Sequence, residues 1–533
     1  MLSRLITSSL VLGLLSSVVT ANFYPITGVK VQGQNTPPRR NINELHAEAG
    51  PQWDLYIQAI AAMQSAKSTD PLSWFQLCSI HGSPPIAWNN TAAGDSSHPG
   101  YCAHAEALFL PWHRPYIATF EQSLVNHAKE IARRYPTKDR ARYVHAAEIL
   151  RTPFWDWAAN PQVPKSTVPS TLKINTAHGR RSVKNPLAGY VYPKDALKGA
   201  FGEFKPTPRN RVGRCPPPKS FPQSANQLFR RDNLRELVYN AFIYSETFEE
   251  FSSTAGPGTS VEQAHNLVHN SAGCGQTMGD LAYAAYDPLF WLHHTNVDRL
   301  YALWQAAHPD KSGLTTPYKG NARFTTPDHS LISPDSPLTP FYLPGDRPHT
   351  SNTVHSTYDL GYTYEGLEKD AKKVVNQKRD ESTQATERSP ARLGYQQDKS
   401  SLNPQDPQII VLQATYTIYP QPTHLPQLPA EEHKRRARGK ITNLYASPAH
   451  KKKRTVHRAH VNYRVEELPD RPCVIDVYLC GFFIGDIVAL GHPHKGSLSA
   501  AVPLNAAIET CNKRDIKPEN YHTNIGFVIT TVG

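Results

Sequence analysis

The sequence predicts a mainly α-helical protein: a four-helix bundle wrapped in long loops and followed by a small C-terminal β-sandwich domain. Three observations lead to this prediction. Histidines and apolar residues share several segments of helical character in the first two thirds of the chain. Long connections rich in proline and glycine, residues 160–224 and 315–359, separate these segments. Nearer the C-terminus, residues 408–419 and 473–490 are rich in the β-branched and aromatic residues of strands.

The helices of the bundle are expected at residues 113–133, 261–270 and 292–305, with the fourth at 43–65 or 144–150. His265 and His269 are four residues apart, so they share one face of their helix. His81 precedes Gly-Ser-Pro-Pro and is therefore expected in a loop, whereas His104 is expected just before a helix.

The first 21 residues are typical of a secretory signal peptide. Arg4 precedes an apolar run at residues 5–19, and cleavage is expected after Ala21. The run is too short to cross a membrane, and no other stretch is long and apolar enough. We therefore expect a secreted, extracellular protein without membrane association. A glycosylation motif that begins at Asn89 fits this location.

A polar stretch, residues 367–404, divides the remaining chain into a larger domain, residues 22–366, and a β-rich domain, residues 405–533. Its composition is that of a linker. Lys378 and Arg379 within it form a dibasic pair of the kind that secretory proteases cut, so a processing protease is an expected partner.

The net charge of +12 is concentrated in part in two basic clusters, residues 434–440 and 451–454. Nucleic acid is excluded as a partner because the chain has no binding motif for it and is expected to be secreted. A solvated loop or a processing site accounts for the clusters. The seven cysteines permit disulfides in an oxidising compartment, but the odd count leaves one over, and the pairing stays open.

Histidines carry the strongest functional signal of the chain. They form two groups of three on separate apolar segments: His81, His104 and His113, then His265, His269 and one of the pair His293 and His294. Neutral imidazole is the commonest metal ligand, and three imidazoles without a thiolate leave the metal an open position. Two such sites facing each other inside a helix bundle would form a binuclear pocket for a diatomic molecule or a substrate. The alternative, ordinary core histidines, requires six coincidences.

Two motifs around these histidines resemble the copper signatures of tyrosinases, catechol oxidases and molluscan hemocyanins. The first runs through His104, Phe109, Trp112, His113, Arg114 and Glu121. The second runs through Asp287, Phe290, Trp291, His294 and Asp298. The segments YPITGV, PPRRNIN and PFWDWA are most similar to the secreted fungal tyrosinases, and the likeness covers residues 22–365.

This resemblance implies two copper ions, each held by three histidines, with O2 as co-substrate. Copper A would bind His81, His104 and His113, and copper B would bind His265, His269 and His294, the second histidine of its pair. The resemblance also implies a thioether between Cys102 and the ring of His104, so Cys102 is the expected leftover cysteine.

Four further residues are assigned roles around the copper ions by the same resemblance. Phe290 is expected to stack on a copper B histidine, and Asp298 to accept a hydrogen bond from the other ring nitrogen of a ligand. Glu262 and Asn266 match positions that hold a water able to deprotonate a phenol in monophenol-hydroxylating relatives. A phenol has a pKa of about 10, so hydroxylation needs a positioned base. The alternative for Glu262 is a carboxylate on a helix surface.

The C-terminal part invites two expectations drawn from the fungal relatives. Tyr362 and Tyr364 would be tied to Arg39 or Arg40, unless they are plain core residues. The C-terminal domain would cover the copper site until it is cut away. Phe482 and Phe483 are candidates for the side chains that plug the site, with a place in the sandwich core as the alternative.

The predicted activity is oxidation of small phenols such as tyrosine, DOPA and catechols, with ortho-hydroxylation of monophenols and conversion of o-diphenols to o-quinones. A catechol oxidase or an o-aminophenol oxidase would share every copper ligand. A hemocyanin-like oxygen carrier would bind O2 without turnover. A zinc or iron hydrolase would need carboxylates at the metals, and the sequence does not place them there. The oligomeric state stays open.

Overall fold

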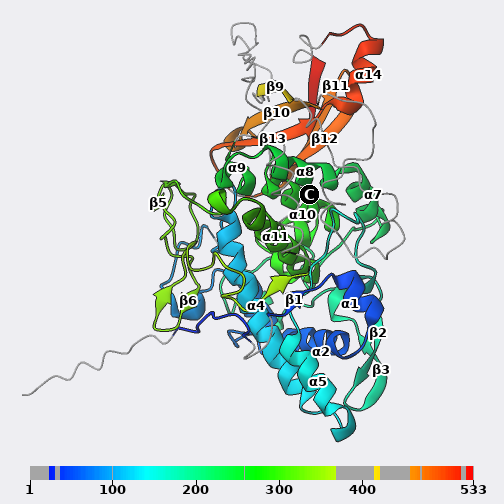
Figure 1. Ribbon diagram of the computed structural model, residues 1–533, viewed down its shortest axis with the longest axis vertical. Helices are drawn as coiled ribbons and strands as arrows, with labels where there is room; N and C mark the ends of the chain where they lie inside the picture. Colours follow the sequence, from blue (N-terminus) through cyan, green and yellow to red (C-terminus); the bar gives the residue numbers. More distant parts are fainter. Residues whose placement is uncertain are drawn as a thin grey trace, which may run out of the picture.

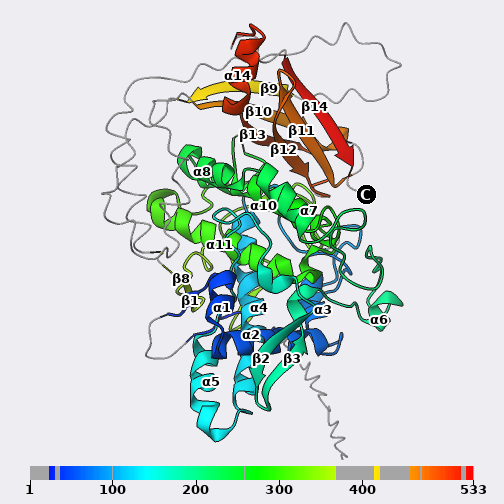
Figure 2. The ribbon, with the colours of Figure 1, turned by 90° about the vertical axis from the view of Figure 1, so that its right-hand side faces the viewer.

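The computed structural model describes residues 23–30, 36–98, 100–256, 258–365, 367, 413–419, 456–468, 471–491, 493–517 and 524–531. Helices dominate up to residue 307, and strands dominate from residue 413 onward. Figure 1 and Figure 2 both show the C-terminal strands, β9 to β14, lying against α8 and α10 at one end of the helical part, whereas α2 and α5 lie at the other end. The expected signal peptide, the dibasic pair and both basic clusters lie outside the described residues.

The helices of the described chain are α1 (Ile42–Glu48), α2 (Pro51–Ser65), α3 (Trp74–Ser79), α4 (Phe109–Ala132), α5 (Thr137–Ile149), α6 (Lys194–Leu197), α7 (Gln223–Arg231), α8 (Leu234–Tyr244), α9 (Phe248–Ser252), α10 (Val261–Ala272), α11 (Pro288–Ala307) and α14 (Asn505–Lys513). The three helices predicted at the histidines are confirmed as α4, α10 and α11. Both candidates for the fourth helix also form: α2 and α5 pack on α4, which in turn packs on α11.

The two helices that follow the loops begin where their sequences provide caps. Ser260 accepts a hydrogen bond from the Gln263 amide and starts α10, while Asp287 accepts one from Leu289 and is followed by proline at the first position of α11. Every residue of α10 is buried, as is nearly every residue of α11. A helix that is buried on all faces has to satisfy its polar side chains internally.

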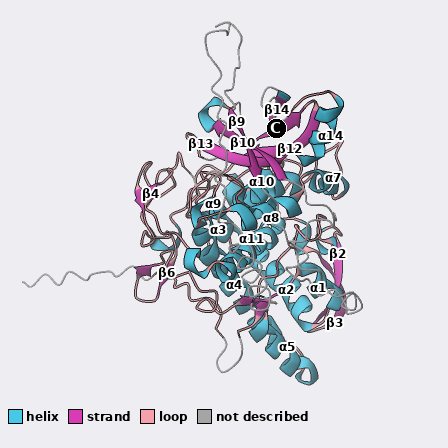
Figure 3. Ribbon diagram, turned by 45° about the horizontal axis from the view of Figure 1, so that its top comes forward, coloured by secondary structure: helices cyan, strands magenta, loops and turns pink. Residues whose placement is uncertain are grey.

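The strands of the C-terminal region are β9 (Gln413–Tyr419), β10 (Val456–Arg464), β11 (Cys473–Leu479), β12 (Phe482–Ala489), β13 (Ser497–Pro503) and β14 (Ile525–Thr531). They form two three-stranded antiparallel sheets, ordered β13-β10-β9 and β12-β11-β14. Figure 3 shows these strands gathered at one end of the helices. The predicted mainly α fold with a small C-terminal strand region is confirmed.

The described helical region also contains four pairs of short strands. The antiparallel hairpins are β2 (Thr171–Thr176) with β3 (Gly179–Lys184), β4 (Tyr318–Lys319) with β5 (Leu331–Ile332), and β6 (Tyr342–Leu343) with β7 (Arg347–Pro348). The strand β1 (Pro38–Arg39) pairs in parallel with β8 (Thr363–Tyr364). This pairing brings the first described segment next to the last part of the helical region.

A buried ionic cluster lies beside that pairing. Arg39 binds Glu121 through Nε at 2.9 Å and Asp298 through Nη1 at 2.9 Å. Arg114 Nε donates to the other oxygen of Asp298 at 2.6 Å. The hydroxyls of Tyr362 and Tyr364 also donate to Asp298, each at 2.6 Å. The expectation that Asp298 orients a histidine ligand is therefore wrong, because two arginines and two tyrosines occupy its carboxylate.

The same cluster decides between Arg39 and Arg40. Arg39 is fully buried, donates to the Tyr364 hydroxyl at 3.0 Å and lies 3.5 Å from the centre of the Tyr362 ring. Arg40 instead forms an ion pair with Glu48 near the surface. The tie between Arg39 and the two tyrosines is thus confirmed.

Backbone hydrogen bonds join the C-terminal region to the helices along a contact that we call the seam. Strand β13 is at the edge of its sheet, and its Ser499 amide donates to Thr254 O at 2.9 Å. The Gln263 side chain of α10 pairs with Ala501 in both directions, at 3.1 Å and 3.2 Å. The amide side chain therefore continues the β-sheet hydrogen bonding onto α10.

Phe482 and Phe483 occupy neither of their two expected places. Phe482 is 42% exposed at the start of β12. Phe483 lies against Tyr478 and has its ring 5.1 Å from the Arg231 guanidinium. Side chains alternate between the two faces of a strand, and the sequence did not reveal which face of β12 meets the helices.

The cysteines pair less completely than expected. Two disulfides form, Cys215–Cys274 and Cys480–Cys511. Cys78, Cys102 and Cys473 are free, so three thiols are left over rather than one. The glycosylation motif is also engaged in the fold, because the Asn89 amide nitrogen donates to Tyr24 O and Pro340 O, each at 3.1 Å. Among the described residues, no helix is long and apolar enough to cross a membrane.

Candidate metal centre

The structure brings the histidines together in two buried groups. His81, His104 and His113 form one group, and His265, His269, His293 and His294 form the other. Within each group, one ring nitrogen of every member lies within 4.8 Å of the others. These are the groups of potential metal ligands in the described part of the chain.

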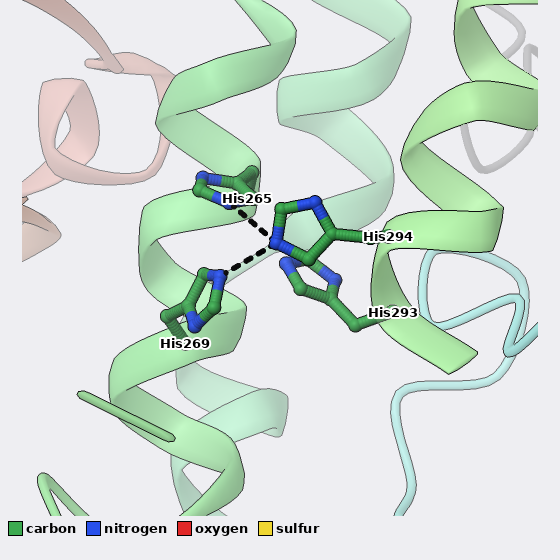
Figure 4. Close-up of side chains that lie close together, drawn as sticks. All are labelled: His265, His269, His293 and His294. Atoms are coloured by element: carbon green, nitrogen blue, oxygen red, sulfur yellow. Dashed lines mark hydrogen bonds between the residues drawn. The ribbon is translucent and has the colours of Figure 1, made fainter. Parts of the chain in front are cut away.

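Helix geometry positions the second group. His265 and His269 project from one face of α10, and His293 and His294 from α11 opposite (Figure 4). The Nε2 atom of His294 lies 3.2 Å from Nε2 of His265 and 3.0 Å from Nε2 of His269. Three Nε2 atoms that converge on one point in this way suit a shared cation.

Outer hydrogen bonds hold the rings with Nε2 turned inward. The Nδ1 atoms lie 3.0 Å from Leu281 O for His81, 2.7 Å from Phe109 O for His113 and 2.7 Å from Met278 O for His269. A carbonyl at Nδ1 fixes the proton there and leaves the Nε2 lone pair for a metal. The buried Nε2 of His113 has no hydrogen-bond partner, as expected for a ligand atom.

Loop geometry places His81, which follows α3. Gly100 adopts a positive φ of 93° beside it, and a Cβ atom there would lie 2.1 Å from His81 O. Tyr101 donates its amide to Ile80 O at 2.9 Å. Only glycine permits this close approach, which presses the segment before His104 against the His81 turn.

Burial keeps the imidazoles neutral. It lowers the pKa of His113 to about 3 and that of His269 to about 4. Burial, together with the neighbouring histidines, holds the pKa values of His265 and His294 well below the usual range. Neutral imidazole is the form that binds a metal, so the groups are ready to bind at neutral pH.

The two groups face each other across a narrow space. The ring centres of His113 and His294 are 4.5 Å apart and nearly parallel. The ring centre of Phe290 lies 4.0 Å from that of His294 and 4.8 Å from that of His81, so Phe290 packs on both groups. The ring centre of Phe109 lies 4.7 Å from that of His265 and 4.9 Å from that of His113, so Phe109 also packs on both groups. The second aromatic wall was not predicted, although Phe109 precedes His113 by one helical turn.

Residues 71–307, which include both histidine groups, match the family model described as the common central domain of tyrosinase. Residues 71–307 belong to the tyrosinase family. The tyrosinase of Podospora anserina is 34% identical over 357 residues, which are 62% of this chain and 62% of that protein. Polyphenol oxidase 2 of Agaricus bisporus is 33% identical over 336 residues, 60% of this chain and 59% of that protein. The matches thus span about three fifths of the length of these relatives.

The fold agrees with this assignment over nearly the whole chain. A solved structure of latent and active mushroom tyrosinase, 22% identical, matches 96% of this chain and 92% of its own with a TM-score of 0.69. The two histidine groups fit two copper ions, because each offers at least three buried imidazoles and no thiolate among its members.

Glu262 is buried rather than on a helix surface, so that alternative is wrong. Its Oε1 accepts from the Ala105 amide at 2.6 Å, and its Oε2 accepts from the amide and hydroxyl of Thr254 at 2.8 Å and 3.0 Å. Burial raises the pKa of Glu262 to about 7. Asn266 offers its Oδ1 to Nδ1 of His265 at 2.9 Å. Glu262 therefore anchors the segment next to His104, and Asn266 orients a histidine of the other group.

Proposed function

We propose that this protein is a tyrosinase that oxidises small phenols with O2, including ortho-hydroxylation of monophenols such as tyrosine and oxidation of o-diphenols such as DOPA and catechols. The observation that carries the proposal is the pair of buried imidazole groups that face each other with His113 and His294 at 4.5 Å. His81, His104 and His113 would hold one copper ion, and His265, His269 and His294 the other. When bound, the copper pair supplies the dioxygen chemistry.

The surrounding residues orient the substrate and move its proton. Phe290 and Phe109 lie beside the space between the two groups, where aromatic rings can pack against a phenol. Glu262, whose pKa is raised by burial to about 7, is suited to accept the phenol proton through a water held with Asn266. Monophenols need this base more than o-diphenols do, because hydroxylation begins from the phenolate.

Oxygen uptake by the copper-loaded protein, cut in the linker, tests the proposal with L-tyrosine and with L-DOPA. We expect uptake with both substrates. Glu262→Gln is expected to lower the rate with L-tyrosine by about a hundredfold and the rate with L-DOPA much less, because loss of a general base costs about that factor. Uptake with L-DOPA alone would make the protein a catechol oxidase. Reversible O2 binding without turnover would make it an oxygen carrier.

We further propose that the C-terminal region is a separate domain that shields the metal centre until the linker is cut. The solved mushroom relative is described as latent and active. Here Tyr463 of β10 is 2% exposed and shares an apolar cluster with Ala105, which follows His104. Burial and the nearby Glu262 carboxylate raise the pKa of Tyr463. Its position at the metal side of the seam makes Tyr463 the better candidate for the shield than Phe482 or Phe483.

Trimming within the linker, or Tyr463→Ala in the full chain, is expected to raise oxygen uptake about tenfold or more, because a tethered side chain competes at a high effective concentration. Tyr478→Ala is the matched control, since this tyrosine packs on Phe483 away from Ala105. Equal turnover before and after trimming would exclude the shield.

Two expectations from the sequence extend the proposal. Cys102 lies in the segment before His104, and its Sγ is 3.0 Å from His81 O. A thioether to the His104 ring would form with loss of the Cys102 S–H hydrogen and one ring C–H hydrogen, with O2 as the two-electron oxidant, so the intact mass of the copper-loaded protein would fall by about 2 Da. An unchanged mass would exclude the bond. We also propose that the protein is secreted, which the two disulfides support, and retention of all of it inside the producing cells would contradict this.

A further inference from the structure

A cluster of charged side chains lies at the seam, remote in sequence from the histidines. Arg231, at the end of α7, contacts Asp486 of β12 and lies 3.8 Å from Asp476 of β11. The two aspartates are directly opposite each other on the paired strands β11 and β12. Phe483 covers the guanidinium with its ring. Two carboxylates of the C-terminal region therefore bind one arginine of the helical region.

A third carboxylate gives this cluster more negative than positive charge. Asp232 follows Arg231 in sequence and lines the same small cavity as Asp486, of about 20 Å³. Both aspartates are only 4% exposed, and each has a buried Oδ1 atom without a hydrogen-bond partner. The other oxygen of Asp232 accepts from the Ser271 hydroxyl of α10 at 2.6 Å. Asp232 and Arg231 lie on the helical side, and Asp476 and Asp486 lie on the strand side, so three carboxylates lie around one guanidinium at the seam.

We propose that Asp232 and Asp486 share a proton while the C-terminal region is docked, and that they act as a pH-controlled latch that releases this region as the pH rises. Two buried carboxylates that face each other do not both ionise without a cost in free energy, whereas a shared proton removes one charge and satisfies an orphaned oxygen. Desolvation raises the pKa of both Asp232 and Asp486; the Asp486 carboxylate adds to the rise for Asp232, and the Asp476 carboxylate adds to it for Asp486.

A metal cation is the other means of neutralising the pair, and the geometry disfavours it. A cavity of about 20 Å³ holds roughly one water molecule, whereas Ca²⁺ needs six to eight oxygens. The Arg231 guanidinium already fills the side nearest Asp486 and would repel a second cation. A shared proton, in contrast, fits a cavity of this size because it adds no coordination shell.

The other groups around the latch set the direction of the pH effect. On the helical side the cavity is lined by Arg231, Asp232 and Glu236 of α8, together with the uncharged Gln263 of α10. On the strand side, Asp486 lines the cavity and Asp476 lies beside it, while the β13 residues at the cavity are apolar. Because the pKa of Asp232 and Asp486 is raised in the docked state, docking is strongest below the ordinary aspartate pKa. It weakens by about tenfold per pH unit for one proton as the pH rises from that ordinary value to the raised pKa, and it levels off above the raised pKa.

Hydrogen exchange measures docking without relying on enzyme activity. The amides of Ser499 and Ala501 point away from their own sheet and are bonded only across the seam, to Thr254 O and to the Gln263 side chain. In the full, copper-loaded chain, exchange at these two amides is followed between pH 5 and pH 10 by mass spectrometry, after division by the intrinsic exchange rate at each pH. We expect protection that declines by up to about tenfold per pH unit as the pH rises toward the raised pKa and then reaches a plateau, the midpoint being the centre of this decline.

Variants separate the latch from a general effect of pH. Asp232→Asn keeps an acceptor for Ser271 but cannot ionise, so the docked state no longer needs a shared proton and the two amides are expected to stay protected at pH values above the parent midpoint. Asp486→Asn, which leaves Asp476 for Arg231, is expected to do the same. Glu236→Gln is the matched control, because this carboxylate lies at the rim of the same cavity and is only half-buried, and its midpoint is expected to stay in place.

Three results would overturn the latch: protection that does not change with pH, the same midpoint in Asp232→Asn as in the parent chain, or protection at pH 7 that is lost on adding EDTA. The consequence for activity rests on the proposed shield. Oxygen uptake measured on the same samples distinguishes the two ideas, because amides that lose protection without any rise in uptake would leave the latch standing and exclude the shield.

Discussion

Replacing His294 with asparagine is expected to leave the protein with one copper ion instead of two and to lower phenol oxidation by on the order of a thousandfold. The Nε2 of His294 is the atom on which His265 and His269 converge, at 3.2 Å and 3.0 Å. Asparagine is too short to reach that point from α11. Copper content by elemental analysis and oxygen uptake with L-DOPA measure the two effects.

His293→Asn is the matched control, since both histidines are fully buried neighbours on α11. The ring of His293 stacks on that of His265 at 4.9 Å, and neither of its nitrogens forms a hydrogen bond. We expect this variant to keep two copper ions and to oxidise L-DOPA within about tenfold of the parent rate, because ligand neighbours contribute about that much. Loss of a copper ion from His293→Asn but not from His294→Asn would reverse the assignment.

Replacing Arg39 with alanine is expected to destabilise the protein by about 3–5 kcal/mol, the typical cost of leaving buried charges without their partner. Arg39 is the sole described link between Glu121 and Asp298, and both carboxylates would stay buried in its absence. The midpoint of urea unfolding, followed by tryptophan fluorescence, measures the change. His113 lies on α4 with Glu121, and His294 lies on α11 with Asp298, so copper content is expected to fall with stability.

The adjacent residue supplies the control for this prediction. Arg40 forms its ion pair with Glu48, whose side chain is 61% exposed. Exposed pairs of this kind contribute about 0–1 kcal/mol, so Arg40→Ala is expected to unfold at nearly the parent urea concentration. Equal losses in the two variants would show that burial of the ionic cluster is not what stabilises this part of the fold.

The sequence predicted those features that depend on local spacing. The helices around His113, His265 and His294 form as expected because their histidines, caps and apolar residues agree within a few turns. Phe290 lies on a copper B histidine for the same reason: it precedes His294 by one turn of α11.

Features that depend on partners from distant segments were not predictable in this way. Asp298 lies one turn after His294, which made it a plausible partner of a ligand, but Arg39 reaches it from 259 positions away. Glu262 belongs to a helix that is buried on every side, which its own sequence does not reveal. The free thiols Cys78 and Cys473 lie in different apolar clusters, so they do not form a disulfide with each other.

We expect the docking of β13 through its outer amides to determine how the two parts of the chain would behave if the linker were cut. While Thr254 and Gln263 occupy that side of the strand, no other chain can add to it. Once the C-terminal region departs, the row of amides and carbonyls from Ser497 to Pro503 becomes an open template for strand addition. Released fragments would then pair with one another rather than return to the helices. The seam would therefore also protect the edge of β13 against self-association, and re-docking of a released fragment would be disfavoured.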